Sequence, residues 1–106
     1  MIVTTTGTIS DKRIIRTLGL VRGNTIRARH AGRDIIAGLR NLVGGEVSEY
    51  TKLFAEAREQ ALDRMVAEAQ ELGANAILEI RFSTSMVMTA AAELMVYGTA
   101  VIVEDE

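Results

Sequence analysis

The spacing of apolar residues changes abruptly at Gly73. Residues 49–72 place an apolar side chain every three or four positions, which is the period of an α-helix. From Leu78 onward apolar and polar residues alternate, which is the period of a β-strand with one buried face. A chain that joins these two patterns is predicted to fold as an α+β domain, with a helix lying on a sheet.

The predicted helix over Glu49–Leu72 is about 36 Å long at 1.5 Å per residue. Ser48 suits the N-cap position, and Gly73 suits the C′ position, where glycine adopts a left-handed backbone at low cost. Alanine dominates the apolar stripe of this helix, so the surface beneath it can approach closely. The stripe consists of Phe54, Ala57, Ala61, Met65, Ala69 and Leu72.

Strands are predicted where β-branched and other apolar residues gather. A turn is expected at Gly23-Asn24, and a short amphipathic helix is expected over residues 33–43. The expected architecture is one domain, residues 1–106, in which an antiparallel sheet carries the long and the short helix. Besides the alternating segment, the predicted strands are Met1–Thr6, Ile14–Arg22, Thr25–Arg29 and Leu94–Val103.

Two methionines lie on the apolar side of the alternating segment. Met86 and Met88 have the same parity as Ile80 and Phe82, so they are predicted to fill gaps in the core. The alternative is a soft-metal site, because thioether sulfur is a soft ligand. Such a site needs further ligands, and this face of the strand adds only Thr84.

Two of the predicted strands, Ile14–Arg22 and Leu94–Val103, are apolar on both faces. One long helix covers at most one face of a sheet, and an uncovered apolar face indicates an interface. We therefore expect a homo-oligomer in which a neighbouring copy covers the second face. The candidate interface residues are Ile15, Val21, Val96, Tyr97 and Ile102.

Composition narrows the classes of function. The chain has 106 residues, of which 48% are apolar, and it has no cysteine, which excludes a thiolate nucleophile and a thiolate metal cage. Its start does not resemble a signal peptide, and no apolar run approaches the roughly 18 residues of a membrane span. The chain is expected to be cytoplasmic, without a membrane partner. Its few aromatic residues count against a nucleic-acid partner.

Charge is distributed unevenly along the chain. Residues 1–45 carry eight basic and two acidic residues, a net charge of +6, and residues 46–106 carry four basic and twelve acidic residues, a net charge of −8. A cluster of cationic residues precedes the predicted helix at 33–43, where free amides favour anions. It is either an anion-binding site or a set of ion pairs across a subunit interface. The anion-binding candidates are Arg22, Arg27, Arg29, His30 and Arg33.

A metal site has few candidate ligands. His30 is the only histidine, and its arginine neighbours would repel a cation, so a polar loop residue is the favoured interpretation over a ligand or proton carrier. Glu79 and Glu93 could bind a divalent metal ion if carboxylates of several subunits converged. The alternative for these two residues is a solvated strand surface.

No catalytic residues are predicted. The glycine spacings of phosphate-binding loops are absent, and the serines have no histidine base nearby. An enzyme therefore ranks below a binding protein among the hypotheses. It would be a small enzyme that holds an anionic substrate at the arginine cluster.

Four segments in combination resemble the YbjQ-like family of small uncharacterised proteins, over a range from Ile2 to about Val103. They read GRDIIAGLRNLVGGE, EAREQAL, LGANAI and YGTAV. The resemblance implies an α+β subunit, a homopentameric ring joined by additional short strands, and a family often labelled heavy-metal-binding. The leading hypothesis is a non-enzymatic homo-oligomeric assembly or binding protein with any ligand site between subunits. The alternative is a heavy-metal-binding protein that uses carboxylates or His30 at subunit junctions.

Overall fold

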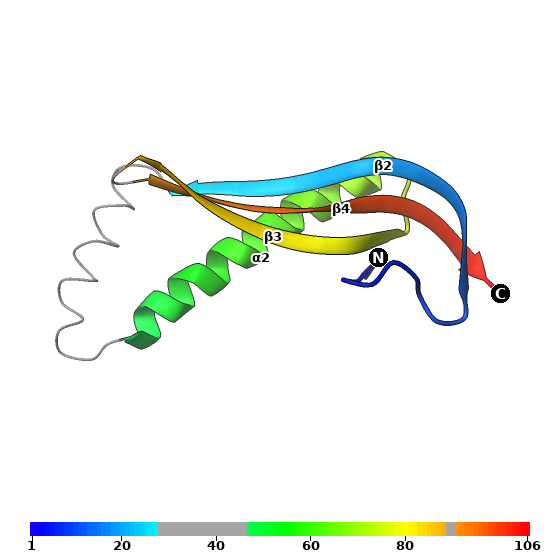
Figure 1. Ribbon diagram of the computed structural model, residues 1–106, viewed down its shortest axis with the longest axis horizontal. Coiled ribbons are helices and arrows are strands. Elements are labelled where there is room, and N and C mark those ends of the chain that lie inside the picture. Colours follow the sequence, from blue (N-terminus) through cyan, green and yellow to red (C-terminus); the bar gives the residue numbers. More distant parts are fainter. Residues whose placement is uncertain (28–46, 89–90) are drawn as a thin grey trace.

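The computed structural model describes residues 1–27, 47–88 and 91–106 and shows four strands and one helix in these ranges (Figure 1). The short helix predicted over residues 33–43 lies outside the described residues, as do residues 89 and 90. The elements in chain order are β1 (Ile2–Val3), β2 (Lys12–Arg27), α2 (Val47–Glu71), β3 (Ala76–Met88) and β4 (Ala91–Asp105).

The strands form one mixed sheet in the order β1-β3-β4-β2. The three long strands pair antiparallel, as predicted. The expectation of a wholly antiparallel sheet is wrong at β1, which lies parallel to β3 with Ile2 beside Ala76 and Val3 beside Ile77. The chain enters the sheet at the edge beside the start of β3 and then crosses to the other edge, where β2 pairs with β4.

Strand β2 is continuous, and the predicted turn at Gly23-Asn24 is wrong. Gly23 pairs with Val96 and Asn24 with Met95, in register with the rest of the strand. The glycine serves close packing instead of a turn. A Cβ atom at Gly23 would overlap the carbonyl oxygen of Ala61 and the amide nitrogen of Met65, so the backbone of α2 rests directly on the strand.

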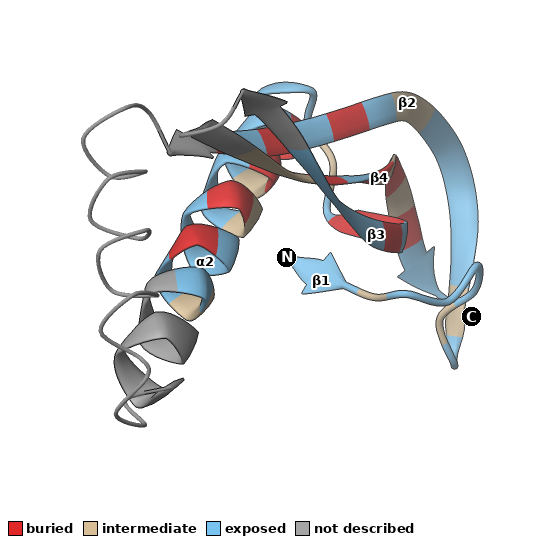
Figure 2. Cartoon of the chain, turned by 60° about the vertical axis from the view of Figure 1, so that its left-hand side comes forward, coloured by how far each residue is buried: buried red, intermediate tan, exposed pale blue. Residues whose placement is uncertain are grey.

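The core lies between α2 and the sheet. The predicted alanine-rich stripe is confirmed, because Ala57, Ala61, Met65 and Ala69 are buried (Figure 2). The ends of the stripe are less covered: the side chains of Phe54 and Leu72 remain 38% and 48% exposed. Across from the helix, the buried residues of the sheet are Val21, Ile77, Ile80, Val96 and Ala100.

Helix α2 ends as the sequence predicts. Gly73 has a φ angle of 84°, in the left-handed region that favours glycine. The amide of Gly73 donates to the carbonyl of Gln70, and the amide of Ala74 donates to that of Ala69, each at 3.0 Å. These are the two hydrogen bonds of a Schellman motif. At the other end the helix begins at Val47, so Ser48 lies inside the helix and the predicted N-cap is wrong.

Strand β3 does not keep the predicted alternation. Glu79 has a φ angle of 54° and is an extra residue between the paired positions Leu78 and Arg81, which is a β-bulge. Because of the bulge, Ile80 packs under α2 whereas Leu78 packs on the opposite face. The prediction that Phe82 belongs to the core is wrong: its side chain is 46% exposed, because α2 lies mainly over β2 and β4.

Among the described residues, the second face of the sheet is covered at one end only. Ile9 packs there against a small buried cluster that contains Leu78, Val101 and Val103. The side chain of Asn75 holds this end together, because it donates to the carbonyl of Val103 and accepts from the amide of Val103, each at 2.8 Å. The N-terminal segment therefore covers part of the sheet face that was predicted from the sequence to be uncovered.

The molecule is thin and long, with principal extents of 54 × 24 × 16 Å and a radius of gyration of 16.9 Å. A compact domain of this length has a radius of gyration of about 13 Å. Within the described ranges, no helix has the length and apolar character that crossing a membrane requires.

Two ion pairs join the start of β2 to the end of β4. Lys12 pairs with Asp105, and Arg13 pairs with Glu104. The hydrogen bond from Lys12, and secondly its positive charge, hold the pKa of Asp105 below its ordinary value of 3.8. Basic residues of the first half and acidic residues of the second half thus meet within one chain at this end of the sheet.

We expect Gly23→Ala to destabilise the fold by about 3 kcal/mol or more, because the added methyl group meets helix backbone, which cannot rotate away. Gly7→Ala is the matched control, since its methyl group would lie 3.1 Å from Oε1 at the flexible end of Glu79. Urea denaturation measures both free energies of unfolding. Equal stability of the two variants would contradict the close approach of α2 to β2.

We expect Lys12→Met to raise the pKa of Asp105 towards its ordinary value, because the substitution removes both causes of the shift. In the unmodified chain the pair stabilises the fold above the unfolded pKa, and this contribution is lost as the pH falls through the lowered folded pKa. Carboxyl-carbon NMR titration measures the effect. Arg13→Met is the control and leaves Asp105 unchanged; an unshifted pKa in Lys12→Met would refute the assignment.

Candidate functional site

The structure separates the described members of the predicted anion-binding cluster. Arg22 is exposed in the middle of β2, and Arg27 is the last residue of that strand. Five residues of strand place them about 16 Å apart. Arg29, His30 and Arg33 lie outside the described residues. The described part of the chain therefore does not assemble the cluster that proximity in sequence suggested.

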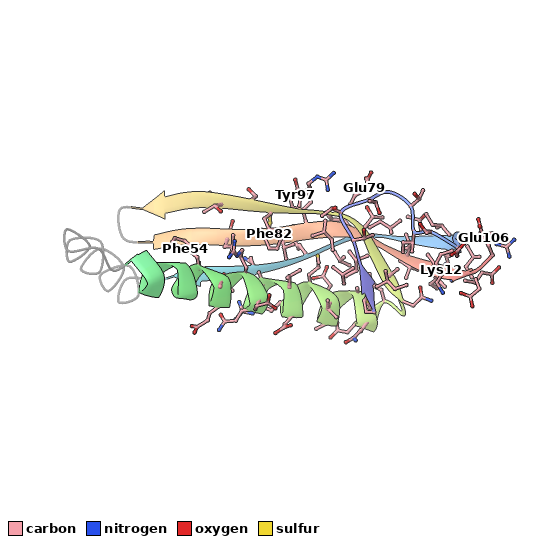
Figure 3. The ribbon with its side chains drawn as sticks, turned by 90° about the horizontal axis from the view of Figure 1, so that it is seen from below. Lys12, Phe54, Glu79, Phe82, Tyr97 and Glu106 are labelled. Atoms are coloured by element: carbon pink, nitrogen blue, oxygen red, sulfur yellow. The ribbon has the colours of Figure 1, made fainter. Side chains whose placement is uncertain are left out.

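Arg22 instead belongs to a row of residues that runs across three strands. Tyr97 on β4 pairs with Arg22 on β2 on one side and with Arg81 on β3 on the other. All three are exposed, and they lie on the sheet face turned away from α2, where Figure 3 shows Tyr97. Side chains at directly paired positions lie about 5 Å apart at Cβ. The register thus places one arginine residue on each side of Tyr97.

Arg81 also holds the N-terminal segment. Its Nη1 atom donates to the carbonyl of Thr5 at 3.1 Å and to that of Ile80 at 2.8 Å. These bonds fix the direction of the side chain without neutralising its charge. The sequence pattern does not reveal this role of Arg81, because its partner Thr5 lies 76 residues away in sequence.

The two described metal candidates, Glu79 and Glu93, do not converge within one chain. Glu79 lies in the bulge of β3, and Glu93 on β4 accepts a hydrogen bond from the side chain of Asn24 at 3.2 Å. Glu93 pairs with Ser85, so the two carboxylates stand about 20 Å apart along the sheet. His30 lies outside the described residues. In the described ranges, no three His, Cys, Asp or Glu side chains are grouped closely enough to hold a metal ion.

Two roles are predicted for Met86 and Met88, as core residues or as soft-metal ligands. Met86 and Met88 are at the end of β3, where they pair with Ala92 and Ala91. Their side chains fall outside the described part of the structure. The core interpretation and the soft-ligand interpretation therefore both remain predictions.

The predicted interface residues divide into two groups. Ile15 is 51% exposed, Tyr97 is 36% exposed and Ile102 is half-buried, so each presents apolar surface. The prediction is wrong for Val21 and Val96, which are fully buried beneath this chain's own helix. Strand parity from sequence does not tell which face the helix covers, and α2 covers theirs.

Leu20 and Phe82 are among the exposed apolar residues that the predicted interface set did not include. Leu20 is 64% exposed on the face away from α2, and Phe82 is 46% exposed on the helix-bearing face beyond the reach of the helix. The sequence contained a signal for the exposure of Leu20, because Leu20 and Val21 are consecutive apolar residues and their side chains point to opposite faces of the strand. Nothing local marked Phe82, since its exposure depends on where α2 crosses the sheet.

One depression lies in the N-terminal segment. It has a volume of about 440 Å³, and its lining offers hydroxyl groups but no acid, base or cation. It is suited to neither acid–base catalysis nor a charged ligand. The lining residues are Ile2, Thr4, Thr6, Thr8, Ile9 and Ser10.

Comparison with known proteins gives a family and a fold. Residues 1–104 match the model of a family described as "Putative heavy-metal-binding". A UPF0145 protein of Dehalococcoides mccartyi is 62% identical over 104 residues, which cover 98% of this chain and 100% of that protein. A UPF0145 protein of Methanosarcina acetivorans is 56% identical over 101 residues, 95% of each chain.

A solved structure is similar over the whole chain. It is the crystal structure of a protein of unknown function from the DUF74 family of Pediococcus pentosaceus, with a TM-score of 0.68 and 18% sequence identity. The match covers 98% of both chains. At this identity the similarity supports the fold and nothing further.

Proposed function

This chain belongs to the YbjQ-like family of UPF0145 proteins, and from that premise we propose that it is a non-enzymatic homo-oligomeric protein whose ligand sites lie between subunits. The observation that carries the proposal is the exposed apolar surface on both faces of the sheet. Leu20 lies on the open face, and Phe82 lies on the helix-bearing face. Covering an exposed Leu or Phe side chain contributes about 1.5–3 kcal/mol.

The shape of the chain supports association. One helix packs on a long sheet, and the radius of gyration of 16.9 Å exceeds the value of about 13 Å for a compact domain of this length. In the part of the chain that the structure describes, both outer edges of the sheet carry unpaired backbone groups, since β2 is an edge strand and β1 pairs with only the start of β3. A neighbouring copy can satisfy these edges and cover the apolar faces in one step.

We propose a ring of five subunits, a number that rests on the family resemblance. The two described metal candidates, Glu79 and Glu93, stand far apart along the sheet, which favours a ligand site completed by a neighbour. An enzymatic role has less support, because no base stands beside Arg22 in the described part of the chain.

We expect light scattering at micromolar concentration to give about five times the chain mass of 11.5 kDa. Leu20→Ser and Phe82→Ser should each weaken the assembly about tenfold or more, because they remove apolar contact area between subunits. Leu72→Ser is the matched control, since Leu72 is 48% exposed at the end of α2 and belongs neither to the surface with Leu20 nor to the surface with Phe82. A mass near 11.5 kDa for the unmodified protein would exclude the proposal.

Heavy-metal binding is the second candidate, which the description of the family favours. The described residues of one chain do not fit such a centre: the whole sequence lacks cysteine, and Glu79 and Glu93 are far apart. We propose that a metal site, if present, combines His30 or carboxylates from neighbouring copies.

The expected result of metal binding is stoichiometric heat when Zn²⁺, Cu²⁺ or Ni²⁺ is titrated into the assembled protein. That heat should disappear in His30→Ala or Glu79→Ala, because each removes a donor group. Glu106→Ala is the control, since Glu106 is an exposed carboxylate at the end of the chain. Absence of binding, or equal binding in all variants, would remove this candidate.

A further inference from the structure

The open sheet face, which we define as Leu20, Arg22, Tyr97 and Arg81, combines apolar surface with positive charge. Leu20 and Tyr97 are 64% and 36% exposed, and both arginines are exposed. Among the described residues the ion pairs are Lys12–Asp105 and Arg13–Glu104. Within those residues, neither Arg22 nor Arg81 has a carboxylate partner, and the guanidinium group of Arg81 donates to the backbone carbonyls of Thr5 and Ile80, which leave its charge unneutralised.

The same chain carries an opposite surface on α2. Ala61 faces the sheet, and a shift of two positions along a helix turns a side chain by about 200°. Glu59 and Asp63 therefore point away from the sheet, and Glu56 follows on the same side of the helix. All three are exposed, and Figure 3 shows side chains projecting from α2 on the side away from the sheet. We call Glu56, Glu59 and Asp63 the acidic ridge.

The two surfaces of one chain cannot meet each other. The acidic ridge faces outward from the helix layer, and the open sheet face lies on the far side of the sheet (Figure 3). The core of the protein stands between them. Any pairing of the two therefore requires two copies of the chain.

We propose that the open sheet face of one subunit receives the acidic ridge of α2 from the next subunit. This inference rests on the proposed homo-oligomer and names the surfaces that join it. Arg22 and Arg81 lie on strands two spacings apart, which is about 10 Å, and Glu56 and Asp63 are separated by about 10 Å along the helix axis. The charges are thus similarly spaced as well as opposite in sign.

A second copy fits this face better than an unrelated partner, because the chain supplies both complementary surfaces. Residues 1–45 have a net charge of +6 and residues 46–106 of −8, and the two ion pairs at the end of the sheet account for only part of this separation. A contact between two different surfaces of the same chain is heterologous, and such contacts close into rings when the rotation permits.

Charge reversal tests the inference. The sheet variant carries Arg22→Glu and Arg81→Glu, the helix variant carries Glu59→Arg and Asp63→Arg, and a third protein combines all four changes. Each reversal alone should raise the concentration at which the assembly dissociates by about a hundredfold, because like charges then face each other. The combined protein should regain assembly, because the charges are opposite again. Light scattering across a dilution series measures all three.

Controls separate association from folding. Arg16→Glu is the matched control, because Arg16 is an exposed residue of β2 that pairs with Ile102, on the other face of the sheet from Arg22. The single variant Arg22→Glu keeps the hydrogen bond between Arg81 and Thr5, so a loss of assembly in this variant is not caused by loss of that bond. Circular dichroism melting confirms that each variant is folded before its mass is interpreted.

The outcomes distinguish the two proposals. If the unmodified protein is oligomeric and both reversals leave its mass unchanged, this inference is overturned and the proposed oligomer stands. If the reversals dissociate the protein but the combined variant does not reassemble, the pairing of these two surfaces is overturned. If the unmodified protein is monomeric at every concentration, the proposed function fails as well.

Discussion

The close packing of α2 on β2 and β4 determines which parts of the sheet remain exposed. Glycine at position 23 and alanine at position 61 bring the two backbones together, so the helix lies over one side of the sheet. A helix is about 10 Å wide and covers roughly two strands. The remaining side, where β3 carries Phe82, and most of the opposite face stay open. The apolar surface that favours association is therefore a consequence of how tightly the helix is seated.

Helix α2 and its glycine cap were predictable from sequence because their signals are local. The apolar stripe repeats along one segment, and Gly73 follows it directly. Gly23 was misread for the opposite reason. A glycine before an asparagine is typical of a turn, and only the helix backbone, which is remote in sequence, shows that the missing side chain provides space for packing.

A single extra residue explains the error in β3. Alternation predicts a face for every residue only while the strand stays regular, and the bulge at Glu79 reverses the assignment on one side of it. Leu78 and Ile80, which appeared to share a face, consequently lie in different clusters. Nothing in the residue types near Glu79 indicates the bulge, so the sequence predicted the strand and the faces of Ile80 and Phe82 but assigned Leu78 to the wrong face.

Proximity in sequence also did not predict which charged residues of the candidate site lie together. Arg22 and Arg27 are neighbours in sequence, yet the strand carries them apart, whereas Arg22, Tyr97 and Arg81 come from three segments and share one row. Register, which sequence patterns do not reveal, decides which charges act together. Once that row is in place, the opposite net charges of the two halves of the chain have a structural meaning. Part of the difference is neutralised by the ion pairs Lys12–Asp105 and Arg13–Glu104 at the end of the sheet. Arg22 from the first half shares the open sheet face with Arg81 from the second half, and the acidic ridge lies on the outer side of α2, so the core separates two surfaces of opposite charge within one molecule.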